Sequence, residues 1–245
     1  MQGSSGLEIL ESRAISVSFG GLSAISDNRL TLARRQIVGL IGPNGAGKST
    51  LINVLTGFQR PSSGVLLLDG IAITAWPPER IARRGVARTF QSVRLFNDLT
   101  VRENVAAAMA SRGQSRRRAL DGAMDVLDAL GLADKAERVA GELPYGEERR
   151  VGIARALATG PRFLLLDEPA AGLNTREVEQ LMLLIGFIRD RYECGILVVE
   201  HNMNLIMAVC ERLHVLDGGR TIAEGGPEQV QSNPAVRAAY LGTRH

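Results

Sequence analysis

Short apolar runs recur along the chain, and most of them end at glycine, proline or charged residues. A loose alternation of apolar and polar residues predicts two longer strands, Leu7–Phe19 and Leu22–Leu32, joined by a turn at Gly20-Gly21. Shorter strands are expected at Ile71–Ile73 and Gly85–Phe90. The pattern predicts an α/β fold with a small β layer ahead of the main strands. Four runs are almost entirely apolar, as strands covered on both faces are: Ile37–Ile41, Val65–Leu68, Arg162–Leu166 and Gly195–Val199.

Helical signals dominate the middle of the chain. Thr100, followed three residues later by Glu103, predicts a capped helix start, and the helix continues through Ala106–Met109. The arginine-rich run Ser115–Arg118 is expected to be a solvated loop before a second, amphipathic helix, Ala119–Leu130. Other helices are predicted at Pro78–Arg84, Leu143–Leu157, Leu181–Arg191, Pro227–Val230 and Pro234–Leu241.

The segment Gly39–Leu51, GLIGPNGAGKSTL, places a glycine-rich turn between a strand and a helix. It matches G-x-x-x-x-G-K-S/T, a loop whose backbone N–H groups surround nucleotide phosphates at the positive end of the next helix. In this pattern Lys48 reaches the β- and γ-phosphates and Ser49 holds Mg²⁺. A plain glycine turn with one surface lysine is the alternative, which the flanking strand and helix disfavour. The predicted nucleotide-binding residues are Gly42, Pro43, Asn44, Gly45, Ala46, Gly47, Lys48 and Ser49.

Several polar residues follow predicted strands, at the end where parallel sheets meet their ligands. Asp167 and Glu168 end a buried strand, so one carboxylate could support the water shell of Mg²⁺ while the other orients or deprotonates water. Gln91 could face the metal or the water, or be a solvated amide. His201 could donate to a γ-phosphate. Phe19 could stack on an adenine ring, or be a core or turn aromatic.

Composition narrows the class of protein. The chain has 245 residues, 45% hydrophobic content and a net charge of +3, values ordinary for a globular protein. Its few aromatic residues are not interleaved with basic ones, which argues against nucleic-acid binding. Cys194 and Cys210 offer neither a disulfide framework nor metal-ligand spacing and favour a reducing cytosol. Met1–Gly6 lacks the parts of a signal peptide, and no run is long enough to cross a membrane, so any membrane role requires a partner.

Taken together, the motifs resemble the ATP-binding subunit of an ABC transporter over Leu7–Gly242. The resemblance rests on Phe19, GPNGAGKST, the glutamine after TF, LPYGE, LLLDEPAAGLN and EH. More narrowly, GVARTFQSVRLFNDLTVRENV, YGEERR and DEPAAGLN resemble the subunits that power import of branched-chain and other hydrophobic amino acids. The family implies a RecA-like P-loop NTPase core with an antiparallel β subdomain, residues 7–96 and 153–245, and an inserted α-helical subdomain, residues 97–152.

The resemblance also implies a role for each motif residue. Phe19 stacks on adenine, and Lys48, Ser49 and Thr50 serve the phosphates and Mg²⁺. The implied metal residues are Ser49, Gln91 and Asp167. The implied catalytic residues are Glu168 as general base, His201 at the γ-phosphate, Gln91 and Lys48.

In this family two ATPases close head-to-tail around two ATPs, and each site is completed by the partner's LSGGQ motif. Leu143–Glu147 occupies that position, but Pro144 and Tyr145 replace the usual serine and glycine. The contact to the partner's nucleotide is therefore assigned to backbone N–H groups of Tyr145, Gly146 and Glu147. Asn174 replaces a usual aspartate, which affects the charge-dependent part of communication across the dimer.

The resulting prediction is an ATPase that powers an amino-acid importer from the cytoplasmic face of the inner membrane. Its expected partners are transmembrane permease subunits, contacted through Gln91–Leu99, an identical or different second ATPase and, indirectly, a periplasmic or extracellular solute-binding protein. An ATPase of lipopolysaccharide or lipid export is the alternative, since CERLHVLDGG and AAYLG also suit it. A soluble ABC ATPase acting on DNA or ribosomes would need an inserted coiled coil or a second nucleotide-binding domain, and the sequence has neither.

Overall fold

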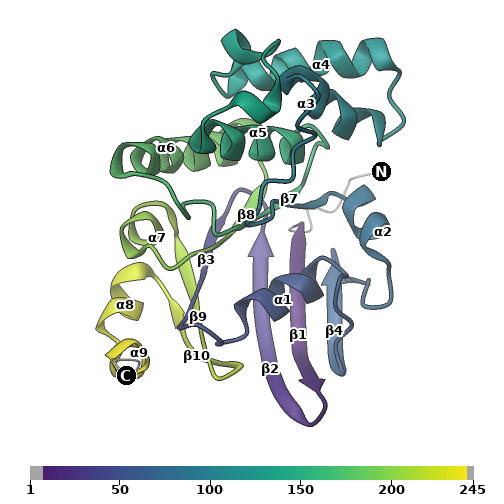
Figure 1. Ribbon diagram of the computed structural model, residues 1–245. Coiled ribbons are helices and arrows are strands. Elements are labelled where there is room, and N and C mark those ends of the chain that lie inside the picture. The colour runs from purple at the N-terminus through teal and green to yellow at the C-terminus, as the bar shows by residue number, and fades with distance from the viewer. Residues whose placement is uncertain (1–7, 242–245) are drawn as a thin grey trace, which may run out of the picture.

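The computed structural model describes residues 8–241, so Leu7 and the predicted domain end at His245 lie outside the described residues. Two sheets form the body of the protein, with helices around them (Figure 1). The first sheet is antiparallel and consists, from edge to edge, of β2 (Leu22–Ala33), β1 (Ile9–Phe19), β4 (Ser63–Leu68) and β5 (Ile71–Ala72). This is the small β layer that the alternating pattern predicts.

The second sheet is largely parallel and carries the strands that precede the motif residues. Only its first pair is antiparallel; the remaining neighbours run parallel. The carboxyl ends of these parallel strands consequently lie along one edge. From edge to edge the strands are β10 (Arg220–Gly225), β9 (Arg212–Asp217), β3 (Ile37–Ile41), β8 (Gly195–Val199), β7 (Phe163–Asp167) and β6 (Val86–Arg88).

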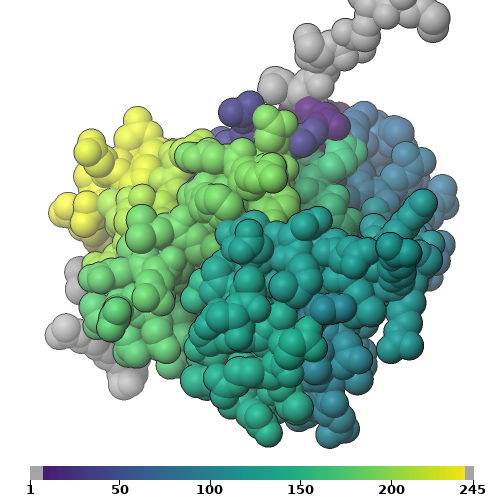
Figure 2. Space-filling view, turned by 90° about the horizontal axis from the view of Figure 1, so that it is seen from above, coloured from purple at the N-terminus to yellow at the C-terminus, as the bar shows by residue number. Residues whose placement is uncertain are grey.

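The helices divide between the sheet and a separate helical region at one end of the molecule, shown from above in Figure 2. The helical region contains α3 (Val101–Ala110), α4 (Arg116–Ala129) and α5 (Tyr145–Leu157). Because α5 is continuous, the predicted subdomain boundary between Gly152 and Ile153 falls inside a helix. The other helices are α1 (Lys48–Leu55), α2 (Pro78–Arg83), α6 (Thr175–Tyr192), α7 (Met203–Val209), α8 (Pro227–Ser232) and α9 (Pro234–Leu241).

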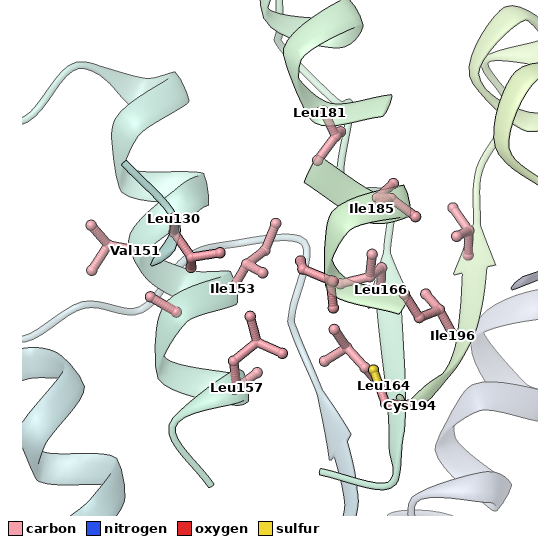
Figure 3. Packing of buried hydrophobic residues seen from close by; sticks show 14 of the residues in the cluster. Leu130, Val151, Ile153, Leu157, Leu164, Leu166, Leu181, Ile185, Cys194 and Ile196 are labelled. Atoms are coloured by element: carbon pink, nitrogen blue, oxygen red, sulfur yellow. The ribbon is translucent and has the colours of Figure 1, made fainter. Parts of the chain in front are cut away.

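Each central strand is apolar on both faces because a different layer covers each face. In β7, Leu164 and Leu166 join a core with α5 and α6, whereas Phe163 and Leu165 join a core with α1 and the antiparallel sheet. Figure 3 shows the first of these cores, in which Leu164, Leu166 and Ile196 lie together with side chains of α5 and α6. The predicted α/β class is therefore confirmed, and the sheet is a rigid base for the loops that follow its strands.

Three sequence predictions about helices need correction. Ser115–Arg118 is not a loop, because Ser115 is the N-cap of α4 and the three arginines form its first turn. They are fully solvated there, and arginine is a good helix former. Helix α6 begins at Thr175 rather than Leu181, since Asn174 and Glu177 form a capping box. Helix α7 was not predicted, because its 7 residues are too few to show a clear helical period.

The two cysteines lie in the hydrophobic core. Cys194 and Cys210 are buried and unpaired, and burial raises the pKa of the two thiols to about 11 and about 12. Both therefore stay protonated and act as small apolar side chains. Among residues 8–241, no helix combines the length and hydropathy needed to span a bilayer.

Candidate active site

The phosphate loop follows β3 and leads into α1, as the motif requires. Gly45 and Gly47 have φ of 78° and 101°, and Gly47 is the N-cap of the helix. A Cβ at Gly47 would lie 2.6 Å from the Ala24 carbonyl oxygen, whereas a Cβ at Gly45 would meet nothing within 4 Å. The loop thus packs tightly on β2 at one point and leaves its other face open, which suits a phosphate group.

Lys48 spans this loop from the first turn of α1. Its side chain is buried, and Nζ donates to the carbonyl oxygens of Gly42 at 2.7 Å and Pro43 at 2.9 Å. Burial lowers the pKa of Lys48, and the negative charge of Glu168 opposes that shift. Lys48 and Glu168, 120 positions apart in the chain, therefore influence each other electrostatically, as two groups facing one triphosphate would.

The predicted strand-end residues Gln91 and Glu168 are in direct contact. Gln91 Nε2 donates to Glu168 Oε2 at 2.6 Å, although the two residues are 77 positions apart. Glu168 has φ of 46°, unusual for a residue other than glycine, and its N–H bonds to the Val199 carbonyl oxygen at 2.8 Å. The strand therefore ends at Asp167, and Glu168 meets Gln91 through Oε2.

Asp167 is largely buried and pairs with Arg88, a residue the sequence analysis did not single out. Arg88 Nη2 lies 2.7 Å from Asp167 Oδ2, and Arg88 Nη1 donates to Asn53 Oδ1 at 2.6 Å. The only sequence signal was an arginine near the end of a strand that pairs with β7. The ion pair fixes Asp167 through Oδ2.

Removing the Arg88 charge should destabilise the protein. In Arg88→Met the Asp167 carboxylate would stay buried without its partner, which typically costs about 3 to 5 kcal/mol. We expect the free energy of unfolding, measured by urea denaturation, to fall by that amount. The matched control is Arg29→Met, because Arg29 pairs with Asp27 on an exposed surface and should contribute at most about 1 kcal/mol. Equal losses in both variants would contradict the importance assigned to burial.

His201 follows β8 and has an exposed side chain, with Nδ1 3.8 Å from Glu200 Oε2. Glu200 itself is buried and accepts from the N–H groups of His201, Asn202 and Ala170 at 2.9, 3.1 and 2.7 Å. It therefore joins the loop after β7 to the loop after β8. The sequence analysis gave Glu200 no role, because a strand-end carboxylate does not reveal which N–H groups it meets.

Phe19 lies at the end of β1, where its side chain is 49% exposed. It pairs with Leu22 across the hairpin, and two residues later Ala24 packs against Gly47 of the phosphate loop. The exposure of Phe19 disagrees with a core aromatic and agrees both with a turn aromatic and with stacking on a base beside the loop, which stays a prediction.

Truncating Phe19 should weaken nucleotide binding without changing chemistry. Stacking of an aromatic ring contributes about 1 kcal/mol, so Phe19→Ala should raise the Kd for ATP several-fold and leave kcat unchanged. Binding would be measured by titration with a fluorescent ATP analogue. Leu22→Ala tests whether any loss comes from the hairpin instead, and an unchanged Kd in Phe19→Ala would exclude stacking.

The first turn of α5 lies beside the loop after β7 and is not bonded to the phosphate loop. Pro144 is its N-cap, and Glu147 Oε1 lies 3.3 Å from Lys135 Nζ, so the Glu147 side chain is engaged locally. Within the described part of the chain, no hydrogen bond or ion pair joins Tyr145, Gly146 or Glu147 to the phosphate loop. The structure thus joins Gln91 to Glu168 directly and couples Glu168 electrostatically to Lys48 of the phosphate loop. Asp167 precedes Glu168 at the end of β7, and His201 follows the neighbouring strand β8.

The residues present fit a magnesium nucleotide better than a metal held by protein alone. No three His, Cys, Asp or Glu side chains of residues 8–241 converge on one point. Ser49 is exposed at the loop, and Asp167 Oδ1 and the Gln91 carbonyl oxygen are further oxygen donors. Mg²⁺ commonly takes one or two protein oxygens and completes its shell with phosphates and water, as this site would allow.

A glycine-rich loop at the head of a helix, beside strand-end carboxylates on a parallel sheet, defines a P-loop nucleoside triphosphatase. The family model described as ABC transporter matches residues 25–171, and the model described as Branched-chain amino acid ATP-binding cassette transporter matches residues 220–245. The chain belongs to the ATP-binding subunits of ABC transporters, and it is an ATPase of that type.

Individual relatives agree with this assignment. The chain is 42% identical to the High-affinity branched-chain amino acid transport ATP-binding protein BraF of Pseudomonas aeruginosa, over 96% of this chain and 98% of the relative. It is 43% identical, with the same coverage, to LivG of Escherichia coli, which carries the same description. The ADP conformation of MJ1267, an ATP-binding cassette of an ABC transporter, superposes with a TM-score of 0.88 and 30% identity, over 96% of this chain and 99% of that one.

Proposed function

We propose that this chain hydrolyses MgATP to power import of branched-chain or other hydrophobic amino acids. The contact between Gln91 and Glu168, beside Lys48 and the phosphate loop, is the observation that carries the hydrolytic part. The match of residues 220–245 to the branched-chain model, together with the names of the relatives, supports the solute class.

The roles proposed for the site residues follow their positions. Loop N–H groups and Lys48 hold the phosphates, and Phe19 stacks on the base. Ser49, Thr50, Gln91 and Asp167 would hold Mg²⁺ directly or through water, and the ion would neutralise charge on the β- and γ-phosphates.

Glu168 is proposed to act as the general base. Gln91 occupies Oε2, so Oε1 is the oxygen that would accept the proton of a water attacking the γ-phosphate. The left-handed backbone at Glu168 places this carboxylate beyond the end of β7. His201, exposed at the end of the neighbouring strand, would donate to the γ-phosphate.

The α5 turn supports a dimeric arrangement. Its N–H groups form a positively polarised helix end, yet within residues 8–241 no hydrogen bond or ion pair joins this turn to the phosphate loop of its own chain. A second ATPase arranged head-to-tail would bring this turn to the partner's nucleotide, through the backbone N–H groups of Tyr145, Gly146 and Glu147.

A groove of about 630 Å³ between the sheet and the helical region is the proposed docking site for the permease subunits. Within Gln91–Leu99, the segment expected to contact the permease, Val93 and Phe96 line the groove, whereas Leu95 packs against the core and Leu99 does not line it. Phe58, Phe90 and Phe96 are all exposed here. Exposed aromatic clusters of this kind mark protein interfaces. This docking would place the chain at the cytoplasmic face of the membrane, as a peripheral subunit.

The groove wall is held in shape by Asn104. Its buried side chain accepts from the N–H of Phe96 at 2.8 Å and donates to the carbonyl oxygens of Phe96 and Thr100, both at 3.0 Å. Phe96 is therefore presented on a turn that is bonded to the helical region, and we propose that residues 97–152 move as a helical subdomain adjoining this turn.

The proposed function is tested by purifying the tagged chain from membranes and identifying what accompanies it. We expect permease subunits and, after reconstitution with a solute-binding protein, ATP-dependent uptake of labelled leucine that excess isoleucine or valine reduces and excess glutamate does not. A complex that extracts lipopolysaccharide or another lipid would favour the export alternative. Recovery of the chain with DNA or ribosomes, and with no membrane protein, would refute a transport role.

A further inference from the structure

Arg149 is a buried arginine on α5, and no residue role described above includes it. Its side chain is 6% exposed, and no carboxylate of the described residues lies within ion-pair distance. Burying a guanidinium without a counter-charge is costly unless its donors are used. What Arg149 binds therefore indicates why it is there.

The guanidinium joins the α5 turn to the loop that carries Glu168. Nη1 donates to the Glu168 carbonyl oxygen at 3.1 Å, and Nη2 donates to the Ala171 carbonyl oxygen at 3.3 Å. Nε and Nη2 also donate to the Tyr145 hydroxyl at 3.2 and 2.5 Å. One planar group thus contacts the first residue of α5 and two carbonyls of the following loop.

The Glu168 backbone needs such support. Its φ of 46° is a conformation that non-glycine residues occupy only when their surroundings hold them there. The Val199 carbonyl holds the N–H of this residue, and Arg149 holds its carbonyl. Without Arg149 the peptide could relax to negative φ, which would swing the carboxylate away from Gln91.

Tyr145 is fixed against the same loop by close packing. A Cβ at Gly172 would lie 2.8 Å from Tyr145 Cε1, and a Cβ at Gly146 would lie 2.5 Å from Glu177 Oε1. The start of α5 and residues 168–177 therefore interlock through two glycines. The hydroxyl of Tyr145 is directed at Arg149 of its own chain, so replacing the usual glycine by tyrosine creates an anchor within the subunit.

We propose that Arg149 is a positioning residue that orients Glu168 and, anchored by Tyr145, makes this orientation depend on the position of the α5 turn. The inference rests on the proposed function, in which Glu168 is the base and the α5 turn reaches the partner's ATP. In the closed dimer, engagement of the α5 turn with the partner's nucleotide would then steady the carboxylate in the subunit's own site.

The test compares Arg149→Met, which keeps an unbranched, apolar stem but removes all donors, with Arg149→Lys and Tyr145→Phe. We expect kcat to fall about 10- to 100-fold in Arg149→Met, since a displacement near 1 Å costs about that much, while the affinity of the monomer for ATP is unchanged. Arg149→Lys should be intermediate, and Tyr145→Phe should lose several-fold. Arg150→Met is the matched control, because Arg150 bonds the Leu130 carbonyl at the end of α4 and not the loop after β7, and it should lower Tm but not kcat.

Double variants separate positioning from general damage. If Arg149 acts through Glu168, adding Arg149→Met to Glu168→Gln should not lower the residual kcat further. If Tyr145 acts through Arg149, adding Tyr145→Phe to Arg149→Met should not lower kcat further either. Full additivity in the Glu168→Gln background, or parent-level kcat in Arg149→Met, would overturn the proposal. If Arg149→Met does not fold, parent-level kcat in Arg149→Lys would overturn the proposal instead. Lys48→Ala, assayed beside these variants, reports on the proposed function itself: ATP binding that survives in it would count against the nucleotide site and not against Arg149.

Discussion

Replacing Glu168 with glutamine is expected to lower kcat for ATP hydrolysis by about 10²- to 10⁴-fold, the usual range for loss of a general base. Glutamine keeps the size of the side chain and can still bond Gln91, but it cannot take a proton from water. ATP binding should survive, so nucleotide would persist between two subunits. The variant should therefore form an ATP-dependent dimer, measured by size-exclusion chromatography with light scattering.

Two comparisons sharpen this experiment. Glu228→Gln makes the same substitution at an exposed residue of α8, and we expect it to match the parent protein. Lys48→Ala removes the buried ammonium group of the phosphate loop, and we expect it to lose both nucleotide binding and the dimer. Hydrolysis by Glu168→Gln at the parent rate would show that Glu168 is not the base.

Phe96→Asp is expected to abolish coupled transport while sparing the ATPase activity of the isolated subunit. Phe96 is 54% exposed and lines the docking groove, on a turn held by Asn104. A carboxylate there would have to be desolvated against apolar permease residues, which costs several kcal/mol. The measurement is solute uptake into proteoliposomes, paired with ATPase assays of the free subunit.

The matched control for this variant is Phe187→Asp. Phe187 is likewise exposed, at 40%, but it lies on α6 and does not line the groove. We expect it to leave both uptake and complex formation intact. Undiminished uptake in Phe96→Asp would show that the permease docks elsewhere, whereas loss of both uptake and soluble ATPase activity would indicate damage to the fold.

The spacing of residues within short segments of the sequence determined many of the secondary-structure elements and much of the candidate site. The phosphate loop, the Thr100 and Glu103 cap, and the apolar strands that end in Asp167-Glu168 and Glu200-His201 are all legible within windows of a few residues. Such signals are strong because the backbone conformation they require depends on adjacent residues. From parallel strands alone, the strand-end residues were expected to share one edge, and the contact between Gln91 and Glu168 confirms that they meet.

Other features were decided only by the tertiary structure. The pairs Arg88 with Asp167 and Arg149 with Glu168 join residues 79 and 19 positions apart, and no periodicity in the sequence distinguishes these arginines from the many exposed ones. The helical state of Arg116–Arg118 was likewise hidden, because a solvated arginine fits both a helix and a loop. The docking groove exists only where the helical region meets the sheet. Side chains that act across the fold have partners set by three-dimensional packing, so their roles appear only after the chain has folded.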